Sequence, residues 1–227
     1  TKPLVGLFNN RPYFSRALDA DLAAMVDAEF RVAGAKSDHD PSFSIEAASR
    51  PFLVSLGARG ELSPETLRRS LMTFLMSFNH RPNPNVAGQT NFSEQARTGA
   101  TLFRDRCEGC HEARLVSDDP ASRAPFASWE RLVLSPEGPL VWGKDAYAKT
   151  GIEPYVHEAG ARVPSLRRLY EKHPYFTNGS AQSLDAVLAM ARFRDRDFVH
   201  DGAPPGEAFE RLDDASRASL RAFLDLL

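Results

Sequence analysis

The sequence predicts an all-α fold with long loops. Apolar residues recur at helical spacing in five separate segments, whereas no stretch shows the alternation of apolar and polar residues that marks a strand. Residues 112–165 are rich in Pro, Gly and Ser and have little periodicity, as expected for a long loop region. The length of 227 residues suits one domain or two small ones.

Two helices are expected in the first part of the chain. One covers about residues 15–31 and can end at Gly34. The other covers residues 63–78, where Ser63 followed by Pro64 is a typical helix start. Their expected packing residues are Leu18, Leu22, Met25, Val26 and Phe30 in the first helix and Leu67, Leu71, Met72, Phe74, Leu75, Met76 and Phe78 in the second.

A break at residues 79–85 divides the chain. This segment reads Asn-His-Arg-Pro-Asn-Pro-Asn, and its two prolines cannot continue a helix. We therefore expect a small helical subdomain over residues 1–90, which precedes a second domain over residues 91–227.

Three more helices are expected in the second domain. Ser93 can cap the first, which runs directly into Cys107, Ser183 begins the second, and the third covers about residues 213–227. Their inward faces hold Ala96, Gly99, Ala100 and Phe103, then Leu184, Val187, Leu188 and Ala191, then Leu220, Phe223, Leu224 and Leu227. The small residues on the first of these faces predict close packing against another helix.

The composition excludes several classes of function. The formal net charge of −2 argues against a nucleic-acid partner, which normally needs a basic face. No run of about eighteen apolar residues exists, so no membrane span is expected. The segment from Thr1 to Leu4 lacks the apolar core of a signal peptide, so an export signal would have been removed or left out.

The two cysteines form the most informative pattern. Cys107 and Cys110 are the only cysteines, and His111 follows directly, an arrangement that random placement gives roughly once in four thousand cases. Cys-x-x-Cys-His is the attachment motif of a c-type haem. Its thiols bond to the porphyrin vinyl groups and its histidine is an axial ligand of the iron. The sequence therefore predicts one covalently bound haem c.

A redox dithiol and a zinc site are the alternatives to haem for this motif. A redox dithiol of thioredoxin type follows a strand of a βαβ unit, and no such pattern precedes Cys107. A zinc site needs four ligands, so His111 and a distant histidine would have to complete it. Haem c is favoured over both. Because this haem is attached outside the cytoplasm, we expect a periplasmic or otherwise exported protein.

Three blocks of sequence surround the motif. They are residues 92–103, Val-Pro-Ser-Leu-Arg at 163–167, and Pro-Tyr-Phe-Thr-Asn-Gly-Ser at 174–180. Together they resemble the C-terminal haem domain of the bacterial dihaem cytochrome c peroxidase superfamily, which includes the enzyme that matures tryptophan tryptophylquinone. The resemblance covers about residues 60–227. It implies a cytochrome c-like haem domain over residues 91–227, preceded by the end of an N-terminal domain and a hinge.

The chain departs from this family in two places. Thr177 and Asn178 stand where the family has His and Asp. The family's N-terminal domain carries a second haem motif, whereas this chain has no third or fourth cysteine. The resemblance thus implies either a monohaem relative or a second haem on a further segment or another chain. It also implies calcium, with no ligands mapped in this sequence.

The iron needs a sixth ligand besides His111. The resemblance implies that Met190, on the helix after the Pro-Tyr-Phe block, is that ligand. His200, in the loop after this helix, is the rival, and an open sixth position is the third alternative. His157 and His173 lie in loops beside charged residues and are expected to be exposed.

Further residues are expected around the haem. Arg167 either holds a haem propionate by a charge-assisted hydrogen bond or is solvated beside Arg168. The aromatic residues Phe103, Tyr175 and Phe176 are expected to pack on the macrocycle, and Trp142 either lines the pocket or anchors its loop.

These expectations fit three functions. The favoured one is transfer of single electrons through a six-coordinate haem to a redox partner protein. The first alternative is a peroxidase-like or oxidative-maturation enzyme, in which this haem relays electrons and a second haem-bearing chain or domain does the chemistry. The second alternative is a haem-based sensor.

Overall fold

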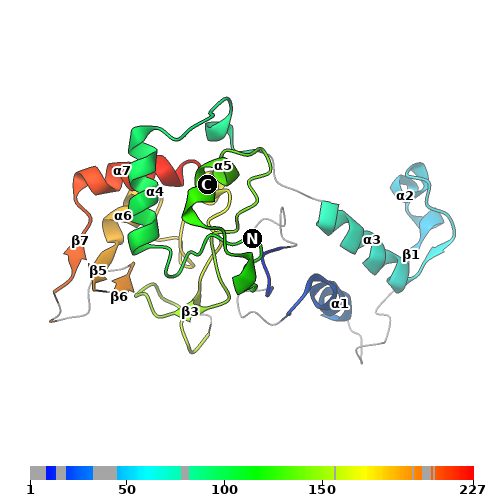
Figure 1. The fold of residues 1–227 in the computed structure, drawn as a ribbon. Coiled ribbons are helices and arrows are strands. Elements are labelled where there is room, and N and C mark those ends of the chain that lie inside the picture. Colours follow the sequence, from blue (N-terminus) through cyan, green and yellow to red (C-terminus); the bar gives the residue numbers. More distant parts are fainter. Residues whose placement is uncertain are drawn as a thin grey trace. The chain divides into compact units, whose positions relative to one another are not determined.

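The chain divides into two compact units, Thr1–His80 and Arg81–Leu227. A computed structural model describes residues 9–13, 19–32, 45–77, 82–155, 157–195, 197–200, 206 and 208–227 (Figure 1). Each unit is described by itself below. None of the helices in the described ranges combines the length and hydropathy needed to cross a membrane.

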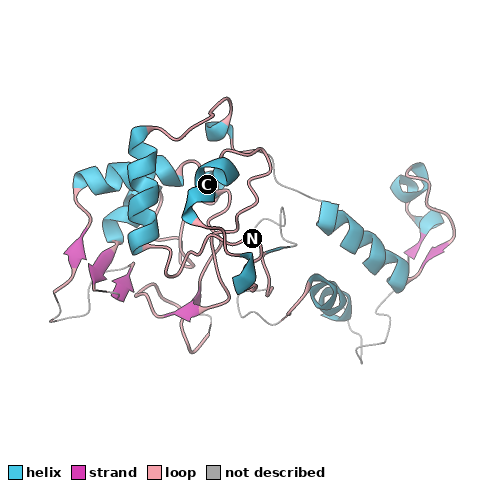
Figure 2. Cartoon of the chain, viewed as in Figure 1, coloured by secondary structure: helices cyan, strands magenta, loops and turns pink. Residues whose placement is uncertain are grey.

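The expectation of an all-α fold is wrong, because the described residues also form three small antiparallel sheets (Figure 2). The pairs are β1 (Ile45–Glu46) with β2 (Glu61–Leu62), β3 (Tyr147–Ala148) with β4 (Ala161–Arg162), and β5 (Arg192–Arg194) with both β6 (Asp197–Val199) and β7 (Glu210–Arg211). Each strand has two or three residues, which is too short for alternation to stand out in the sequence.

The first unit contains the two expected helices and one short additional helix. The helices are α1 (Leu22–Val32), α2 (Pro51–Ser55) and α3 (Pro64–Ser77). Helix α3 confirms the prediction over residues 63–78, although Phe78 lies outside the described residues. Helix α1 begins later than expected, since Asp21 Oδ1 accepts the Ala24 N–H at 2.8 Å and caps the helix there.

A small core joins α1 and α3. It consists of Tyr13, Leu22, Met25, Val26 and Leu75, with Leu71 and Met72 packed against it. Phe74 and Met76 were expected to pack as well, but they are 51% and 61% exposed. The apolar face of α3 is therefore narrower than its sequence suggests.

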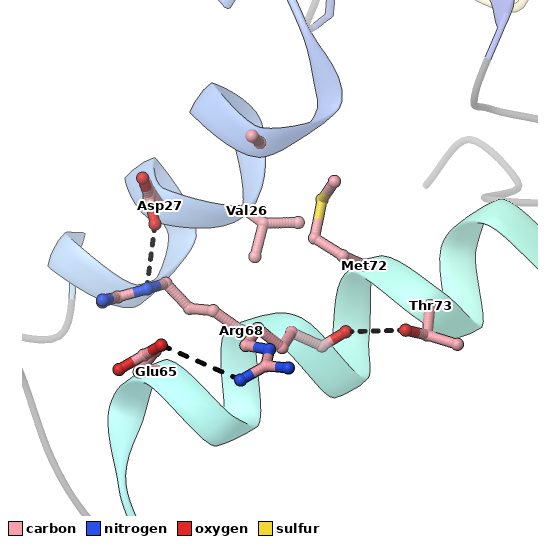
Figure 3. A pocket seen from close by; sticks show the side chains of 8 residues that line it. Val26, Asp27, Glu65, Arg68, Met72 and Thr73 are labelled. Carbon is pink, nitrogen blue, oxygen red and sulfur yellow. Dashed lines mark hydrogen bonds and ion pairs between the residues drawn. The ribbon is translucent and has the colours of Figure 1, made fainter.

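An open groove runs between α1 and α3, with a volume of about 400 Å³. Figure 3 shows Val26 and Met72 pointing toward one another across it. Charged side chains also line the groove: Arg68 Nε lies 2.9 Å from Asp27 Oδ1, and Arg69 lies 3.9 Å from Glu65. Positive and negative groups are matched here, so the groove has no obvious charge preference for a ligand.

The second unit contains the three helices expected after residue 90. They are α4 (Glu94–Arg106), α6 (Leu184–Met190) and α7 (Asp214–Leu224), joined by a short α5 (Trp129–Val133) inside the expected loop region. Polar side chains cap each of the three: Ser93 and Ser183 accept backbone N–H groups at 3.1 Å, and Asp213 accepts one at 2.6 Å. Capping of this kind begins each helix where the sequence predicts it.

Helices α4 and α7 cross at very close range (Figure 1). A Cβ atom added to Gly99 would lie 1.9 Å from the carbonyl oxygen of Ser219 and 3.0 Å from Phe223 Cβ. Only glycine therefore lets the two backbones approach this far. The small-residue face predicted for α4 is confirmed as a helix-packing face.

Residues before α4 also belong to the second unit. The side-chain amides of Asn83 and Asn85 both donate to the carbonyl oxygen of Asp225 at 2.9 Å. Val86 is buried in the main core. These contacts tie residues 83–86 to the end of α7.

Glu130 of α5 supports the start of α4. Its carboxylate accepts the backbone N–H of Phe92 and pairs with Arg97 at 3.0 Å. The Phe92 N–H, and then the Arg97 guanidinium, lower the pKa of Glu130. The carboxylate thus stabilises the fold only when it is ionised.

Replacing Glu130 with glutamine is expected to reduce stability in a pH-dependent way. At pH 7 we expect Glu130→Gln to lower the free energy of unfolding by about 0.5–1 kcal/mol, because the ion pair is partly screened by solvent. A carboxylate with a lowered folded-state pKa stabilises above its unfolded pKa of about 4.3 and loses that effect as the pH falls through the folded value. Urea unfolding at pH 7 and pH 3 should show a deficit at pH 7 that shrinks at pH 3. Glu137→Gln, at an exposed loop position, should show neither effect, and an equal deficit at both pH values would contradict the proposed role of the charge.

Candidate haem site

The Cys-x-x-Cys-His segment forms one short turn at the end of α4. The Cys107 N–H donates to the Phe103 carbonyl at 2.8 Å, which continues the helical hydrogen bonding. The Cys110 and His111 N–H groups both donate to the Cys107 carbonyl, at 3.1 and 3.0 Å. Two half-buried free thiols and one imidazole are thereby held on a single turn.

The protonation of Cys107 bears on the choice between haem and a redox dithiol. Burial, and then the neighbouring Cys110, raise the pKa of the Cys107 thiol to about 12. A redox-active dithiol instead needs a lowered thiol pKa, because the thiolate is the nucleophile. The described residues also contain no group of three or more His, Cys, Asp or Glu side chains arranged to hold a metal ion.

His111 is a neutral imidazole with an unused nitrogen. Burial lowers its pKa to about 4, against the opposite effect of the Trp142 and Pro164 carbonyls. Its Nδ1 is buried and lacks a partner of good geometry among the described residues. A metal-bound histidine is neutral, and a buried imidazole nitrogen without a partner is available to bind a metal. The environment of His111 therefore fits an iron ligand.

A cluster of four aromatic rings backs this turn. Phe103, Trp129, Trp142 and Phe223 all contact one another, with ring centroids 4.9–6.1 Å apart. Phe103 also lies 6.5 Å from the His111 ring. Both Phe103 and Trp142, expected beside the haem, are thus in the main core next to the histidine.

The Val-Pro-Ser-Leu-Arg block packs on the segment that carries Trp142. Ser165 Oγ donates to the Val141 carbonyl at 2.5 Å, and the Leu166 N–H donates to the Trp142 carbonyl at 3.3 Å. Arg167 is buried, and its Nε donates to the Leu140 carbonyl at 3.1 Å. Burial lowers the Arg167 pKa to about 10, so the side chain is still a cation at pH 7. Arg167 is therefore not the solvated arginine that was its alternative.

The Pro-Tyr-Phe block reaches toward His200. The hydroxyl of Tyr175 donates to the Leu169 carbonyl at 3.0 Å, and its ring packs against the main core. Phe176 has a φ of +67° and places its ring 5.3 Å from that of His200. Thr177 and Asn178, the two departures from the family pattern, are exposed.

His200 is held from three directions. Its backbone N–H donates to the Thr150 carbonyl at 2.8 Å. The centroid of its ring lies 4.5 Å from that of Phe198 and 5.3 Å from that of Phe176. Its Nδ1 is buried without a hydrogen-bond partner among the described residues. Burial, and then a positive charge on His111, lower the pKa of His200 to about 3.

The other candidate ligands occupy different settings. Met190 is the last residue of α6, is half-buried, and is not among the residues that pack against the main core. His157 is half-buried rather than exposed, stacks on Tyr147 with centroids 4.4 Å apart, and accepts the Ala159 N–H through Nδ1. His173 is exposed, as expected.

Several residues near the motif were missed by the sequence analysis. Glu108, inside the motif, is buried and pairs with Arg123 at 2.9 Å. Lys144 Nζ donates to the Gly109 carbonyl and lies 3.3 Å from Glu112. The Glu108–Arg123 and Lys144–Glu112 ion pairs therefore connect the motif and the residue after it to later parts of the chain. Charged residues on a loop carry no periodicity, so nothing in the sequence distinguished these from solvated side chains.

The fold of this chain is similar to that of a MauG-like protein. That solved structure, described as a MauG-like protein associated with microbial copper homeostasis, matches with a TM-score of 0.52 and 13% sequence identity. The match covers 100% of this chain and 74% of the other. No protein-family model and no curated protein matches the sequence.

Proposed function

We propose that this chain is a c-type cytochrome that transfers single electrons through one covalently bound haem. The observation that carries the proposal is the single turn of Cys107, Cys110 and His111, with its neutral, buried imidazole against the aromatic cluster. The similarity to a MauG-like fold agrees with the resemblance of the sequence to the dihaem peroxidase superfamily.

Different residues of the site would attach the haem, bind its iron and enclose its ring. Cys107 and Cys110 would form the two thioether bonds, and His111 would be the proximal ligand. When bound, the haem iron supplies the exchange of one electron. Phe103, Trp142, Tyr175 and Phe176 would exclude water from the macrocycle, and the buried cation of Arg167 would pair with a propionate. Attachment of this kind implies an exported, periplasmic protein with a redox partner protein.

A second candidate function follows from the fold similarity. In a peroxidase-like or oxidative-maturation enzyme this haem would be the relay, and a second haem on another segment or chain would be the catalytic group. The fold of a MauG-like protein favours this candidate over a sensor. Fast reaction of the isolated haem-loaded chain with peroxide would favour an enzyme, whereas the electron-transfer proposal expects slow reaction.

Replacing both cysteines tests the haem assignment. After expression together with a haem-attachment system, the wild-type chain should keep its haem on a denaturing gel and give a c-type pyridine haemochrome. The Cys107→Ser/Cys110→Ser variant should lose all covalent haem, because no other cysteine exists in the chain. Absence of covalent haem from the wild type under these conditions would overturn the proposal.

A further inference from the structure

The position of His200 carries an inference that rests on the proposed function and deepens it. We propose that His200 is the second axial ligand of the haem iron, in place of Met190. The iron would then be bound by two histidines, His111 and His200.

The first argument is the cost of burying His200 as it stands. Its backbone N–H donates to the Thr150 carbonyl, but its Nδ1 is buried and has no hydrogen-bond partner among the described residues. A buried polar group without a partner costs about 1–3 kcal/mol. A bond between this nitrogen and a metal would offset that cost.

The second argument is that the Pro-Tyr-Phe block adjoins the surroundings of both histidines. Tyr175 packs against the core that contains Phe103, whose ring lies 6.5 Å from that of His111. The next residue, Phe176, places its ring 5.3 Å from that of His200. In both histidines the Nδ1 is buried and has no hydrogen-bond partner among the described residues. Imidazoles are typical ligands for iron.

The third argument is the rigidity of the His200 ring. Phe176 and Phe198 contact it from two sides, and the Thr150 carbonyl fixes its backbone. Phe176 comes from the Pro-Tyr-Phe block, so that block positions the ring. Axial ligands are held in this way by the residues around them.

Met190 lacks the same necessity. A thioether is a weak hydrogen-bond acceptor and loses little when it is buried without a ligand. Burial of Met190 without a ligand therefore costs little free energy, whereas burial of the unpartnered Nδ1 of His200 is costly unless it binds the iron. Two histidine ligands also give a lower reduction potential than one histidine and one methionine, so the redox partner would be one of low potential.

Spectroscopy of the oxidised haem-loaded protein tests the inference. The wild type should be low-spin and lack the weak red-edge absorption band of a methionine–iron bond. Met190→Leu should leave the spectrum unchanged. His200→Ala should change it, either to a high-spin form or to one with the methionine band.

Controls keep the test independent of folding. Added imidazole should restore the low-spin spectrum of His200→Gly, which a merely structural role of His200 would not allow. His157→Ala changes another half-buried loop histidine and should leave the spectrum as in the wild type. A methionine band in the wild type that Met190→Leu abolishes would overturn the inference, as would a high-spin wild type. In both cases covalent haem on a denaturing gel would leave the proposed function standing.

Discussion

Gly99→Ala is expected to destabilise the second unit strongly. The new Cβ would meet the Ser219 carbonyl oxygen at 1.9 Å, and backbone atoms on both helices cannot turn aside as a side chain can. Helices α4 and α7 would have to separate by about 1 Å or more to reach normal contact. Overpacking of this kind costs about 3 kcal/mol, the upper end of its usual range. Thermal and urea unfolding of the haem-loaded chain should show this loss.

Thr98→Ala is the matched control for this change. It places the same residue on α4 one position earlier, where the side chain is exposed. Because alanine has the higher helix propensity, we expect no loss of stability or a slight gain. Equal unfolding midpoints for Gly99→Ala and Thr98→Ala would show that the two helices do not pack as closely as described.

Local signals in the sequence were enough to predict helices α4, α6 and α7 of the second unit, whereas the five-residue α5 was not predicted. Caps such as Ser93 and Asp213 lie at the positions where the helices begin, and the face around Gly99 indicated a close helix neighbour. The start of α1 was misplaced, because the apolar spacing extends to Leu18 while the cap at Asp21 begins the helix later. The strands were missed, because each pairs only two or three residues with a partner that the local sequence does not specify.

The candidate site could be predicted in part for the same reason. The Cys-x-x-Cys-His pattern is local, so Cys107, Cys110 and His111 could be named from spacing alone. The environment of His200 depends on Thr150, Phe176 and Phe198, two of which are distant in the sequence. The resemblance implied Met190, whereas the buried Nδ1 of His200, which only the fold reveals, is the ground for proposing His200.

Phe103→Ala is expected to have the other large effect on stability. The Phe103 ring is 1% exposed and contacts Trp129, Trp142 and Phe223. Its removal takes one ring from a cluster in which each member touches the other three, so the remaining rings cannot close the space without losing their own contacts. Truncation of a buried phenylalanine costs about 3–5 kcal/mol, a large share of the stability of a small domain. We expect the melting temperature of the haem-loaded chain to fall by about 10 °C.

Phe126→Ala separates this cavity effect from the loss of an aromatic ring as such. Phe126 contacts Trp129 at 4.9 Å and lies under the Arg104 guanidinium, but its side chain is 36% exposed. Its truncation should cost about 1 kcal/mol or less, because solvent fills the vacated space. Phe103 also adjoins the candidate site, since its carbonyl accepts the Cys107 and Glu108 N–H groups and its ring lies near His111. If the two variants melted at the same temperature, the buried position of Phe103 in the cluster would add nothing to stability beyond the contribution of a partly exposed ring.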